Sequence, residues 1–388
     1  MEVKPGYKLT EVGVIPDDWG IATLGTVASI IDPQPDHRTP PEVSGGEPYI
    51  GISDFINDTL VDWSNCRKII PLALDKQQIN FQICHGDIIF GKIGTIGSPK
   101  FLPVTLFRYA LSANVILIKP KIESHFLMSW LKSSLVQKRI NQELHSTSQA
   151  AFGILKMREL SIALPPLSEQ RSIATVLSDM DALLRSLDQL IAKKRDLKQA
   201  TMQQLLTGKK RLPGFEGDWK LKRLGDILTI CHGRSQHEVE VRDGQYPILA
   251  TGGKIGYANR YLYDKPSVLI GRKGTIDQPQ YMDTPFWSVD TLFYSIIRDL
   301  NNAKFIFYRF CLIDWRQYNE ASGVPSLNAR TIESIEILCP KPEEQRAIAT
   351  ALSDMDTELA ALEQRRDKTR ALKQGMMQEL LTGRTRLL

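Results

Sequence analysis

The sequence lacks several features that would place a protein in a class at once. Its five cysteines show no CxxC spacing, and an odd number of scattered thiols fits reduced cysteines better than a disulfide framework. The amino terminus has no charged segment followed by an apolar one, and no later apolar run approaches the ~20 residues that cross a bilayer. We therefore expect a cytoplasmic protein without a membrane segment.

The sequence also lacks a strong excess of positive or negative charge, and it lacks the common catalytic motifs. Lys and Arg number 49 against 44 Asp and Glu, and this mild excess permits contact with phosphates without indicating it. The sequence contains no GxxxxGK[ST], no GxGxxG between a strand and a helix, no HExxH and no GxSxG. Its six histidines are scattered without a second pair of ligands nearby. We therefore expect no catalytic site, no metal and no cofactor.

What the sequence does contain is an internal repeat. Residues 165–212, which read PPLSEQRSIATVLSDMDALLRSLDQLIAKKRDLKQATMQQLLTGKKRL, align without a gap with residues 340–387, and 28 of the 48 positions are identical. Looser matches extend the repeat, because Asp18-Trp19 returns as Asp218-Trp219 and the segment at residues 88–99 returns at residues 268–279. The chain is therefore a duplication of a variable unit followed by a nearly invariant segment.

The variable units differ in length. The offset between matched segments is 198 at residues 46–50 and 180 at residues 88–99, so the first unit carries 18 extra residues, somewhere around residues 54–86. Both units contain short β-rich apolar stretches separated by Gly, Pro, Asn and Asp, which favours a mixed α/β or mainly β unit with long loops. Single helices are expected at residues 125–142 and 303–318.

The invariant segment is predicted to be a long helix. Residues 168–207 contain no Gly or Pro, Ser168 is the expected N-cap, and Gly208 is the stop signal. A helix of ~38 residues would extend ~57 Å. The apolar residues alternate four and three apart as in a heptad seam, and in the first copy they are Ile173, Leu177, Met180, Leu184, Leu187 and Ile191.

Two packing arrangements are open to this seam. It could lie on the core of its own domain, or the two copies could bury their seams on each other as an antiparallel pair, which we favour. In that pair we expect the seam of the first helix to meet the residues Ile348, Leu352, Met355 and Leu359 of the second.

Two glycine-rich loops, GKIGT at residues 91–95 and GRKGT at residues 271–275, are candidate phosphate sites. Glycines let the backbone approach a ligand and open amide N–H groups toward an anion. A tight β-turn with basic side chains in solvent is the alternative, and recurrence in both halves favours a function. The candidate DNA-binding residues of these loops are Lys92, Gly94, Thr95, Arg272, Lys273 and Thr275.

A second candidate lies in the segment GKIGYANRY at residues 253–261. Asn259 and Arg260 carry the side chains that can read adenine and guanine edges, and Tyr257 lies beside them. A solvated hairpin tip is the alternative. The segments that precede each long helix, residues 146–156 and 321–330, keep the offset of 175 and could bring Gln149 and Asn328 close to the same ligand.

Together these features resemble the specificity subunit of type I restriction-modification systems. The resemblance covers nearly the whole chain: the opening YKLTEVGVIPDDW, two variable units, and two segments of the form PxxxEQRxIA, each followed by a long helix that ends in LLTGxxRL. It implies an α+β, internally duplicated fold with two globular α/β target recognition domains, at residues 1–164 and 213–339. Two long antiparallel coiled-coil helices, at residues 165–212 and 340–388, would separate them.

The resemblance also implies a function without catalysis. Each recognition domain would read one half of a split site in double-stranded DNA, and the two half-sites should differ because the two units differ. The partners would be two modification (methyltransferase) subunits, with restriction subunits added for cleavage. The duplicated EQR segments are the expected docking residues, namely Glu169, Gln170 and Arg171 with Glu344, Gln345 and Arg346.

Two functions from other classes stay open. A coiled-coil adaptor without DNA contact would use the helices alone. A nucleotide-dependent transferase would use the GKIGT and GRKGT loops. Recovery of an enriched DNA sequence opposes the adaptor, and tight binding of S-adenosylmethionine or ATP by the isolated chain favours the transferase.

Overall fold

A computed structural model of the chain describes residues 4–34, 38–145 and 151–387. It forms two compact units, one made of Met1–Leu187 with Arg365–Leu388 and the other of Asp188–Gln364. None of the helices in the described ranges combines the length and hydropathy that a membrane crossing requires. All five cysteines are free thiols, and the described His, Cys, Asp and Glu residues include no group of three that could share a metal ion.

The first unit joins a mixed α/β domain to parts of two long helices, α6 (Leu167–Leu206) and α10 (Pro342–Leu380). The domain's strands are β1 (Tyr7–Thr10), β2 (Gly13–Pro16), β3 (Gly20–Thr23), β4 (Ala28–Ile31), β5 (Glu42–Ile50), β6 (Arg67–Ile69), β7 (Ile88–Gly91), β8 (Pro99–Phe101), β9 (Ala110–Leu111), β10 (Val115–Pro120) and β11 (Ser161–Leu164). Its helices are α1 (Leu24–Val27), α2 (Pro71–Gln78), α3 (Ser124–Lys132), α4 (Ser134–His145), α5 (Ile154–Arg158) and the 3-10 turn η1 (Ile52–Asp54).

The second unit contains the other parts of α6 and α10 and a domain of the same kind. Its strands are β12 (Lys220–Arg223), β13 (Leu228–His232), β14 (Tyr246–Ala250), β15 (Gly253–Ala258), β16 (Ser267–Gly271), β17 (Gln280–Met282), β18 (Trp287–Ser288), β19 (Leu292–Ile297) and β20 (Glu336–Cys339). Its helices are α7 (Leu224–Ile227), α8 (Ala303–Leu312), α9 (Ala329–Ser334) and the 3-10 turn η2 (Trp315–Tyr318).

The two domains share one sheet topology. A four-stranded sheet has the order β4-β10-β7-β8 in the first domain and β13-β19-β16-β17 in the second, and a three-stranded sheet has the order β6-β5-β9 and β15-β14-β18. The inner strands β7 and β16 are fully buried, which explains why their sequences are uninterrupted apolar runs. The duplication seen in the sequence therefore extends to strand order and to α/β class.

The extra residues of the first domain lie on either side of β6. The connections there are residues 51–66 and 70–87, whereas the corresponding connections around β15 are residues 251–252 and 259–266. Helix α2 forms in the second of the longer connections and packs on a small core that includes Tyr49, Ile69 and Leu74. The insertion thus gives the first domain a helix for which the second domain has no counterpart among its described elements.

The long helices start and stop close to the predicted residues. Helix α6 begins at Leu167, so Ser168 lies inside the first turn, and the prediction that it is the N-cap is wrong because the helix starts directly after Pro166. Gly208 and Gly383 follow the two helices with φ of 72° and 69°. The left-handed conformation that ends a helix is available to glycine without strain, which explains both stop signals.

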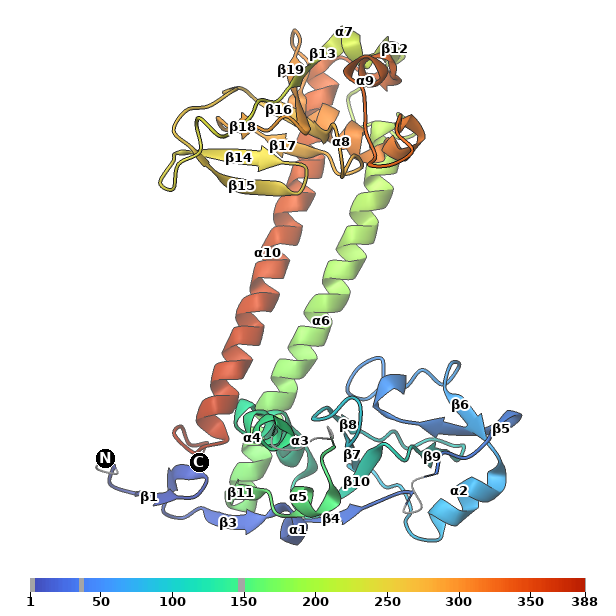
Figure 1. Cartoon of the computed structure of the whole chain (residues 1–388), viewed down its shortest axis with the longest axis vertical. Coiled ribbons are helices and arrows are strands. Elements are labelled where there is room, and N and C mark those ends of the chain that lie inside the picture. The colour runs from blue at the N-terminus through green and yellow to red at the C-terminus, as the bar shows by residue number, and fades with distance from the viewer. Residues whose placement is uncertain (1–3, 35–37, 146–150, 388) are drawn as a thin grey trace. The chain divides into compact units, whose positions relative to one another are not determined.

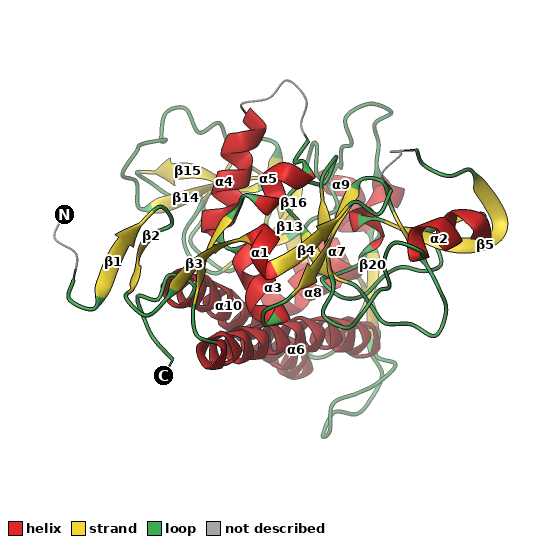
Figure 2. Ribbon diagram, turned by 90° about the horizontal axis from the view of Figure 1, so that it is seen from below, coloured by secondary structure: helices red, strands yellow, loops and turns green. Residues whose placement is uncertain are grey.

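The helices run antiparallel, and Figures 1 and 2 show them side by side. In the first unit, Ile173 and Leu177 of α6 share a core with Leu380 from the end of α10. In the second unit, Ile348 at the start of α10 shares a core with Leu205 near the end of α6. The first half of each helix therefore packs on the second half of the other and on the α/β domain of its own unit.

This register corrects the expected seam. The residues that were expected to face each other lie in separate cores, because an antiparallel pair places the start of one helix against the end of the other. The prediction that Ile173 and Leu177 face Ile348 and Leu352 is therefore wrong, although the antiparallel pairing itself is confirmed. Each long helix thus packs both on the core of its own domain and on the other long helix, so the two arrangements considered from the sequence occur together.

Two other predicted helices are each broken. The expected helix at residues 125–142 is divided into α3 and α4 at Ser133, which is buried in an extended conformation while its hydroxyl accepts from the N–H of Val136 at 3.4 Å. The helix expected at residues 303–318 ends at Leu312, and Asp314 then caps the turn η2. In both cases a short polar side chain satisfies the next turn's N–H group and restarts the chain in a new direction.

Candidate nucleic-acid interface

The two glycine-rich loops directly follow the buried strands β7 and β16, and close backbone contact requires their first glycine. A Cβ atom on Gly91 would lie 1.9 Å from the carbonyl oxygen of Thr95, and one on Gly271 would lie 2.1 Å from that of Thr275. Gly94 has a φ of 78°, a conformation that glycine adopts without steric cost. Both loops are therefore tight turns.

Several amide groups of these loops are used inside the protein. The N–H of Lys92 donates to the carbonyl of Asn114 at 2.9 Å, and the N–H groups of Arg272 and Lys273 donate to the carbonyl of Thr291 at 2.8 and 3.2 Å. A backbone N–H is a single donor. These three N–H groups are therefore not open to a phosphate, and the expectation that the loops hold an anion stays a prediction that depends on the side chains and the remaining amides.

In the first loop the basic side chain lies inside a pocket. Lys92 is 6% exposed, and its ammonium donates to the carboxylate of Asp32 at 2.9 Å. Both residues line a pocket of about 520 Å³ together with Ile93 and residues 151–156. Thr95 is exposed. A ligand would therefore meet Lys92 within this pocket and Thr95 on the open surface.

In the second loop the basic side chains are more accessible. Arg272 is half-buried, and its Nε donates to the backbone carbonyl of Asp290 at 2.8 Å. Lys273 is exposed, and Thr275 is half-buried. The side chains of this loop therefore keep donors for a ligand.

The duplicated segments that precede the long helices lie against these loops. The N–H of Phe152 donates to the carbonyl of Lys92, and the N–H of Leu327 donates to the carbonyl of Arg272, both at 2.9 Å. Asn328 is exposed and caps α9 by accepting from the N–H of Arg330. Gln149 lies outside the described residues. Loop and segment thus form one surface region in each domain, as the shared offset suggested.

Corresponding positions in the two regions carry different chemistry. Asp32 and Lys92 of the first domain correspond to His232 and Arg272 of the second, because the strands that position them pair in the same order. A carboxylate that accepts from an ammonium in the first domain is thereby replaced by an imidazole, which packs on the ring of Phe293 at 4.9 Å, and by a guanidinium that donates to a backbone carbonyl. The shared topology presents two different sets of donors and acceptors.

The hairpin of β14 and β15 carries an exposed aromatic and basic cluster. The ammonium of Lys254 donates to the hydroxyl of Tyr257 at 2.7 Å and lies 4.4 Å from the centroid of its ring. Ile255 is 52% exposed on the same strand. The cluster offers cationic donors and a flat apolar surface together.

Arg260 follows this hairpin and is held against an aromatic ring. Its guanidinium lies 5.8 Å from the centroid of Trp287 and 3.8 Å from the carboxylate of Glu238, and its side chain is 63% exposed. The N–H of the exposed Asn259 donates to the carbonyl of Val239 at 3.0 Å, which fixes its backbone. Both side chains therefore extend from an anchored backbone into solvent.

The EQR segment of the first helix belongs to a buried cluster that sequence reasoning missed. Glu169 is 2% exposed and accepts from Nε1 of Trp19 at 3.0 Å. Arg386, beyond the end of α10, binds both carboxylate oxygens of Glu169 at 2.7 and 2.8 Å and also binds Asp18. These hydrogen bonds raise the pKa of Arg386, and the bond from Arg386 lowers the pKa of Asp18. We call this group the first clasp.

The second unit contains the same arrangement, which we call the second clasp. Arg211, beyond the end of α6, binds both carboxylate oxygens of Glu344, which is 2% exposed. Trp219 donates to Glu344 at 3.2 Å, and Arg211 also donates to the carbonyl of Gly217 at 2.6 Å. Each clasp ties the end of one long helix to the start of the other within one unit.

The clasps leave little of the EQR segments for a partner. Gln170 and Gln345 are also buried, and their amide groups donate to the carbonyls of Pro165 at 2.8 Å and Pro340 at 3.1 Å. Only Arg171 and Arg346 are exposed. The signal for the clasps was present in the sequence, since the tryptophans and the arginines are duplicated along with the glutamates.

Comparison with known proteins agrees with the resemblance seen in the sequence. A family model described as the type I restriction modification DNA specificity domain matches residues 16–193 and 216–370. The MjaX specificity subunit of a type I restriction enzyme from Methanocaldococcus jannaschii is 26% identical over 429 residues, covering 98% of this chain and 97% of that one. The MjaVIII specificity subunit of the same organism is 22% identical over 417 residues, covering 96% and 94%.

Solved structures show the same fold. The S subunit of a type I restriction-modification system from M. genitalium aligns with a TM-score of 0.64 at 16% identity, covering 98% of both chains. A chain from a study of complex assembly and conformational transition of the type I R-M system aligns with a TM-score of 0.57 at 19% identity, covering 95% of this chain and 99% of that one. With two matched regions that span most of its length, the chain belongs to the type I restriction-modification DNA specificity family, and its general role is DNA recognition.

Proposed function

We propose that each recognition domain reads one half of a bipartite, asymmetric site in double-stranded DNA, while the two long helices set the spacing between the half-sites. The observation that carries this proposal is that two domains of one topology present different side chains at corresponding positions. Asp32 and Lys92 in one domain stand where His232 and Arg272 stand in the other. Two domains with different side chains, joined by helices of matched sequence, are suited to a DNA site whose two halves differ.

The second domain supplies candidate base-reading groups. The planar guanidinium of Arg260 can donate two parallel hydrogen bonds to guanine, and the amide of Asn259 can pair with adenine. The aromatic ring of Trp287 limits the freedom of Arg260, which lowers the entropy lost on binding. Lys273, Arg272 and Thr275 are the corresponding candidates for phosphate contacts, because their side chains carry donors at or near the surface of their loop.

The test is selection of bound duplexes from a random pool by the chain assembled with its methyltransferase subunits. We expect one enriched sequence made of two unlike halves, separated by a fixed number of unselected base pairs and with centres near one helical turn of ~10 bp. A palindromic sequence, or an enriched sequence without a spacer, would contradict the proposal.

Arg260→Ala should change the specificity at one position. We expect a loss of ~1–3 kcal/mol in discrimination at a single base pair of the second half-site, because one bidentate contact is removed. The specificity profile of the variant complex measures this, with Lys273→Ala as the matched control that should weaken binding to all sequences alike. A change in the first half-site, or none, would exclude Arg260 as a reader.

The proposed partners are two identical methyltransferase subunits, with restriction subunits added for cleavage. The EQR segments support two equivalent docking positions, because the exposed Arg171 and Arg346 occupy the same place in the two helices. Native mass spectrometry of the saturated complex should give one specificity chain with two methyltransferase chains. Saturation at one copy of each would refute equivalent docking.

A further inference from the structure

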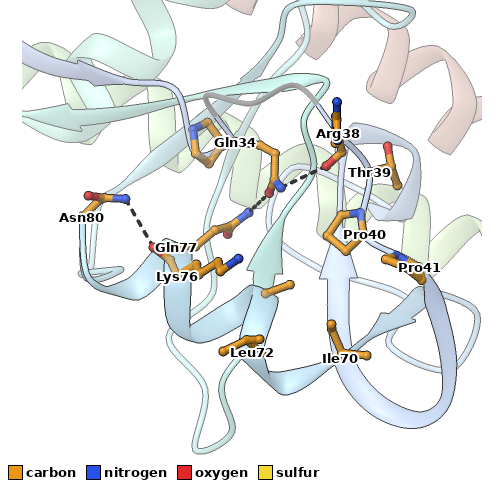
Figure 3. A pocket seen from close by; sticks show the side chains of 12 residues that line it. Gln34, Arg38, Thr39, Pro40, Pro41, Ile70, Leu72, Lys76, Gln77 and Asn80 are labelled. Atoms are coloured by element: carbon orange, nitrogen blue, oxygen red, sulfur yellow. Dashed lines mark hydrogen bonds between the residues drawn. The ribbon is translucent and has the colours of Figure 1, made fainter.

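A pocket of about 460 Å³ lies between helix α2 and residues 33–34 and 38–41 in the first recognition domain (Figure 3). Its apolar walls are formed by Pro33, Pro40, Pro41, Ile70 and Leu72, and its polar groups come from the loop and from the helix. Proline fixes the backbone φ angle. Much of the rim of the pocket is therefore preorganised for a ligand.

A chain of amide hydrogen bonds holds the two sides of the pocket together. Gln77 of α2 is 4% exposed and exchanges two hydrogen bonds with the backbone of Leu111, at 2.7 and 2.9 Å. It also donates to the side-chain oxygen of Gln34 at 2.7 Å, and Gln34 donates to the backbone carbonyl of Arg38 at 3.0 Å. The network fixes the backbone that carries Arg38 relative to the helix that carries Lys76 (Figure 3).

The charged groups among the described lining residues have one sign. Arg38 and Lys76 line it, and none of the described lining residues is an Asp or a Glu. Within the described part of the chain, no hydrogen bond or ion pair ends on the guanidinium of Arg38 or on the ammonium of Lys76. On the same helix, by contrast, Asp75 lies outside the lining and pairs with Arg108 at 2.8 Å. The carboxylate of α2 is thus paired elsewhere, and both cations stay available.

Neutral donors complete the lining. The exposed Thr39 hydroxyl lies on the loop side, and the amide of Asn80 lies at the end of the helix, where it donates to the carbonyl of Lys76 at 3.3 Å. Figure 3 shows Lys76 extending from α2 toward the wall that carries Pro40. Two cations, a hydroxyl and an amide, with no carboxylate among the described lining residues, match the needs of a phosphate group.

We propose that this pocket binds a backbone phosphate of the DNA beside the first half-site. The proposal rests on the proposed function, because a domain that reads a duplex brings phosphates to its surface whether or not a base is contacted. The second domain has no counterpart of α2 in its connection at residues 259–266. The contact therefore belongs to the first half-site alone and makes the phosphate footprint of the complex asymmetric.

The experiment compares the wild-type complex with the complexes that carry Arg38→Gln, Lys76→Gln or both. Lys68→Gln is the matched control, because Lys68 is an exposed cation of the neighbouring strand β6 outside the lining. Affinity for the selected duplex is measured from about 50 to about 200 mM salt. We expect the slope of log affinity against log salt to fall by about 1 for each cation removed, so that this rise in salt weakens the wild type about fourfold more than each single variant.

Neutral methylphosphonate linkages locate the contact. A single linkage flanking the first half-site should weaken the wild-type complex and leave the double variant unaffected, and the same linkage beside the second half-site should affect both complexes equally. The sequence selected from a random pool should stay unchanged in all variants, because a phosphate carries no base identity.

Several outcomes would overturn the proposal: an unchanged salt slope in the double variant, an equal loss in Lys68→Gln, or a changed base preference in the first half-site. Failure of the proposed function is distinguishable from these. It would appear as wild-type complex that binds duplex DNA without selecting a sequence, and the salt slopes would still decide whether the pocket holds a phosphate.

Discussion

Replacing Arg386 with alanine should lower the free energy of unfolding by about 3–5 kcal/mol, because it leaves a buried carboxylate without its cation. Glu169 is 2% exposed, and Arg386 supplies two of the hydrogen bonds to its oxygens. After the substitution only Nε1 of Trp19 still donates to this carboxylate among the described contacts. The end of α10 would then lose this polar attachment to the start of α6, while the shared apolar core and the pair of Lys373 with Asp181 remain.

Chemical denaturation and limited proteolysis measure this effect. The matched control is Arg384→Ala, which removes an exposed arginine two positions away that lies 3.6 Å from Glu379 and should change stability by no more than about 0.5 kcal/mol. Arg211→Ala should be destabilising to a similar degree, because Arg211 binds the equally buried Glu344. A denaturation midpoint for Arg386→Ala equal to that of the control would show that the first clasp is dispensable.

The clasp also predicts a dependence on pH. The hydrogen bond from Arg386 holds the pKa of Asp18 below its ordinary value of 3.8. A carboxylate with a depressed pKa stabilises the fold above its unfolded pKa and loses that contribution as the pH falls through the folded one. The difference in free energy of unfolding between wild type and Arg386→Ala should therefore be largest at neutral pH. It should become smaller as the pH falls below 3.8.

The sequence predicted the elements that depend on local pattern. Gly208 and Gly383 marked the helix ends correctly, since a left-handed residue after a helix is a local requirement. The repeat predicted the antiparallel pair, but it did not predict the register. In that register Ile173 packs near Leu380, because the order of contacts depends on the whole fold.

The candidate site was predicted less well for a similar reason. The glycines of GKIGT suit both an anion site and a tight turn, and the choice depends in part on Asn114, which lies in the turn before β10 and whose carbonyl accepts from the amides of Lys92 and Ile93. The burial of Lys92 beside Asp32 is equally non-local. The duplicated Trp19 and Arg386 could have been paired with Glu169 from the sequence, had the antiparallel arrangement been applied to every duplicated polar residue.

A fragment that ends after Leu212 should form a dimer, whereas the full chain makes the same contacts within one molecule. The fragment contains Arg211 and Lys198, which stand 175 positions before Arg386 and Lys373 in the repeat. In the full chain Lys373 binds Asp181 at 2.5 Å, and Lys198 binds the corresponding Asp356. The end of the helix in one fragment can therefore form the same ion pairs with the start of the helix in a second fragment, because each fragment contains both partners of every pair.

Burial of apolar side chains also favours the dimer of fragments, and it contributes more free energy than the ion pairs. In the first unit Ile173 and Leu177 share their core with Leu380, the last residue of α10, and with Leu381 directly after it, both of which the fragment lacks. The corresponding Leu205 and Leu206 of a second fragment have the same side chains and can fill that space. Leaving two leucines' worth of core exposed would cost several kcal/mol, at about 1.5–3 kcal/mol for each side chain.

Sedimentation equilibrium at micromolar concentration measures the outcome. We expect twice the mass of the fragment, and we expect Arg211→Glu in the fragment to shift it toward monomer because it places a carboxylate against the buried Glu169 of the second copy. Arg185→Glu is the matched control, since Arg185 is an exposed arginine of α6 outside both clasps. A fragment that is monomeric and well folded, with helical content intact, would show that the long helices do not depend on each other for burial.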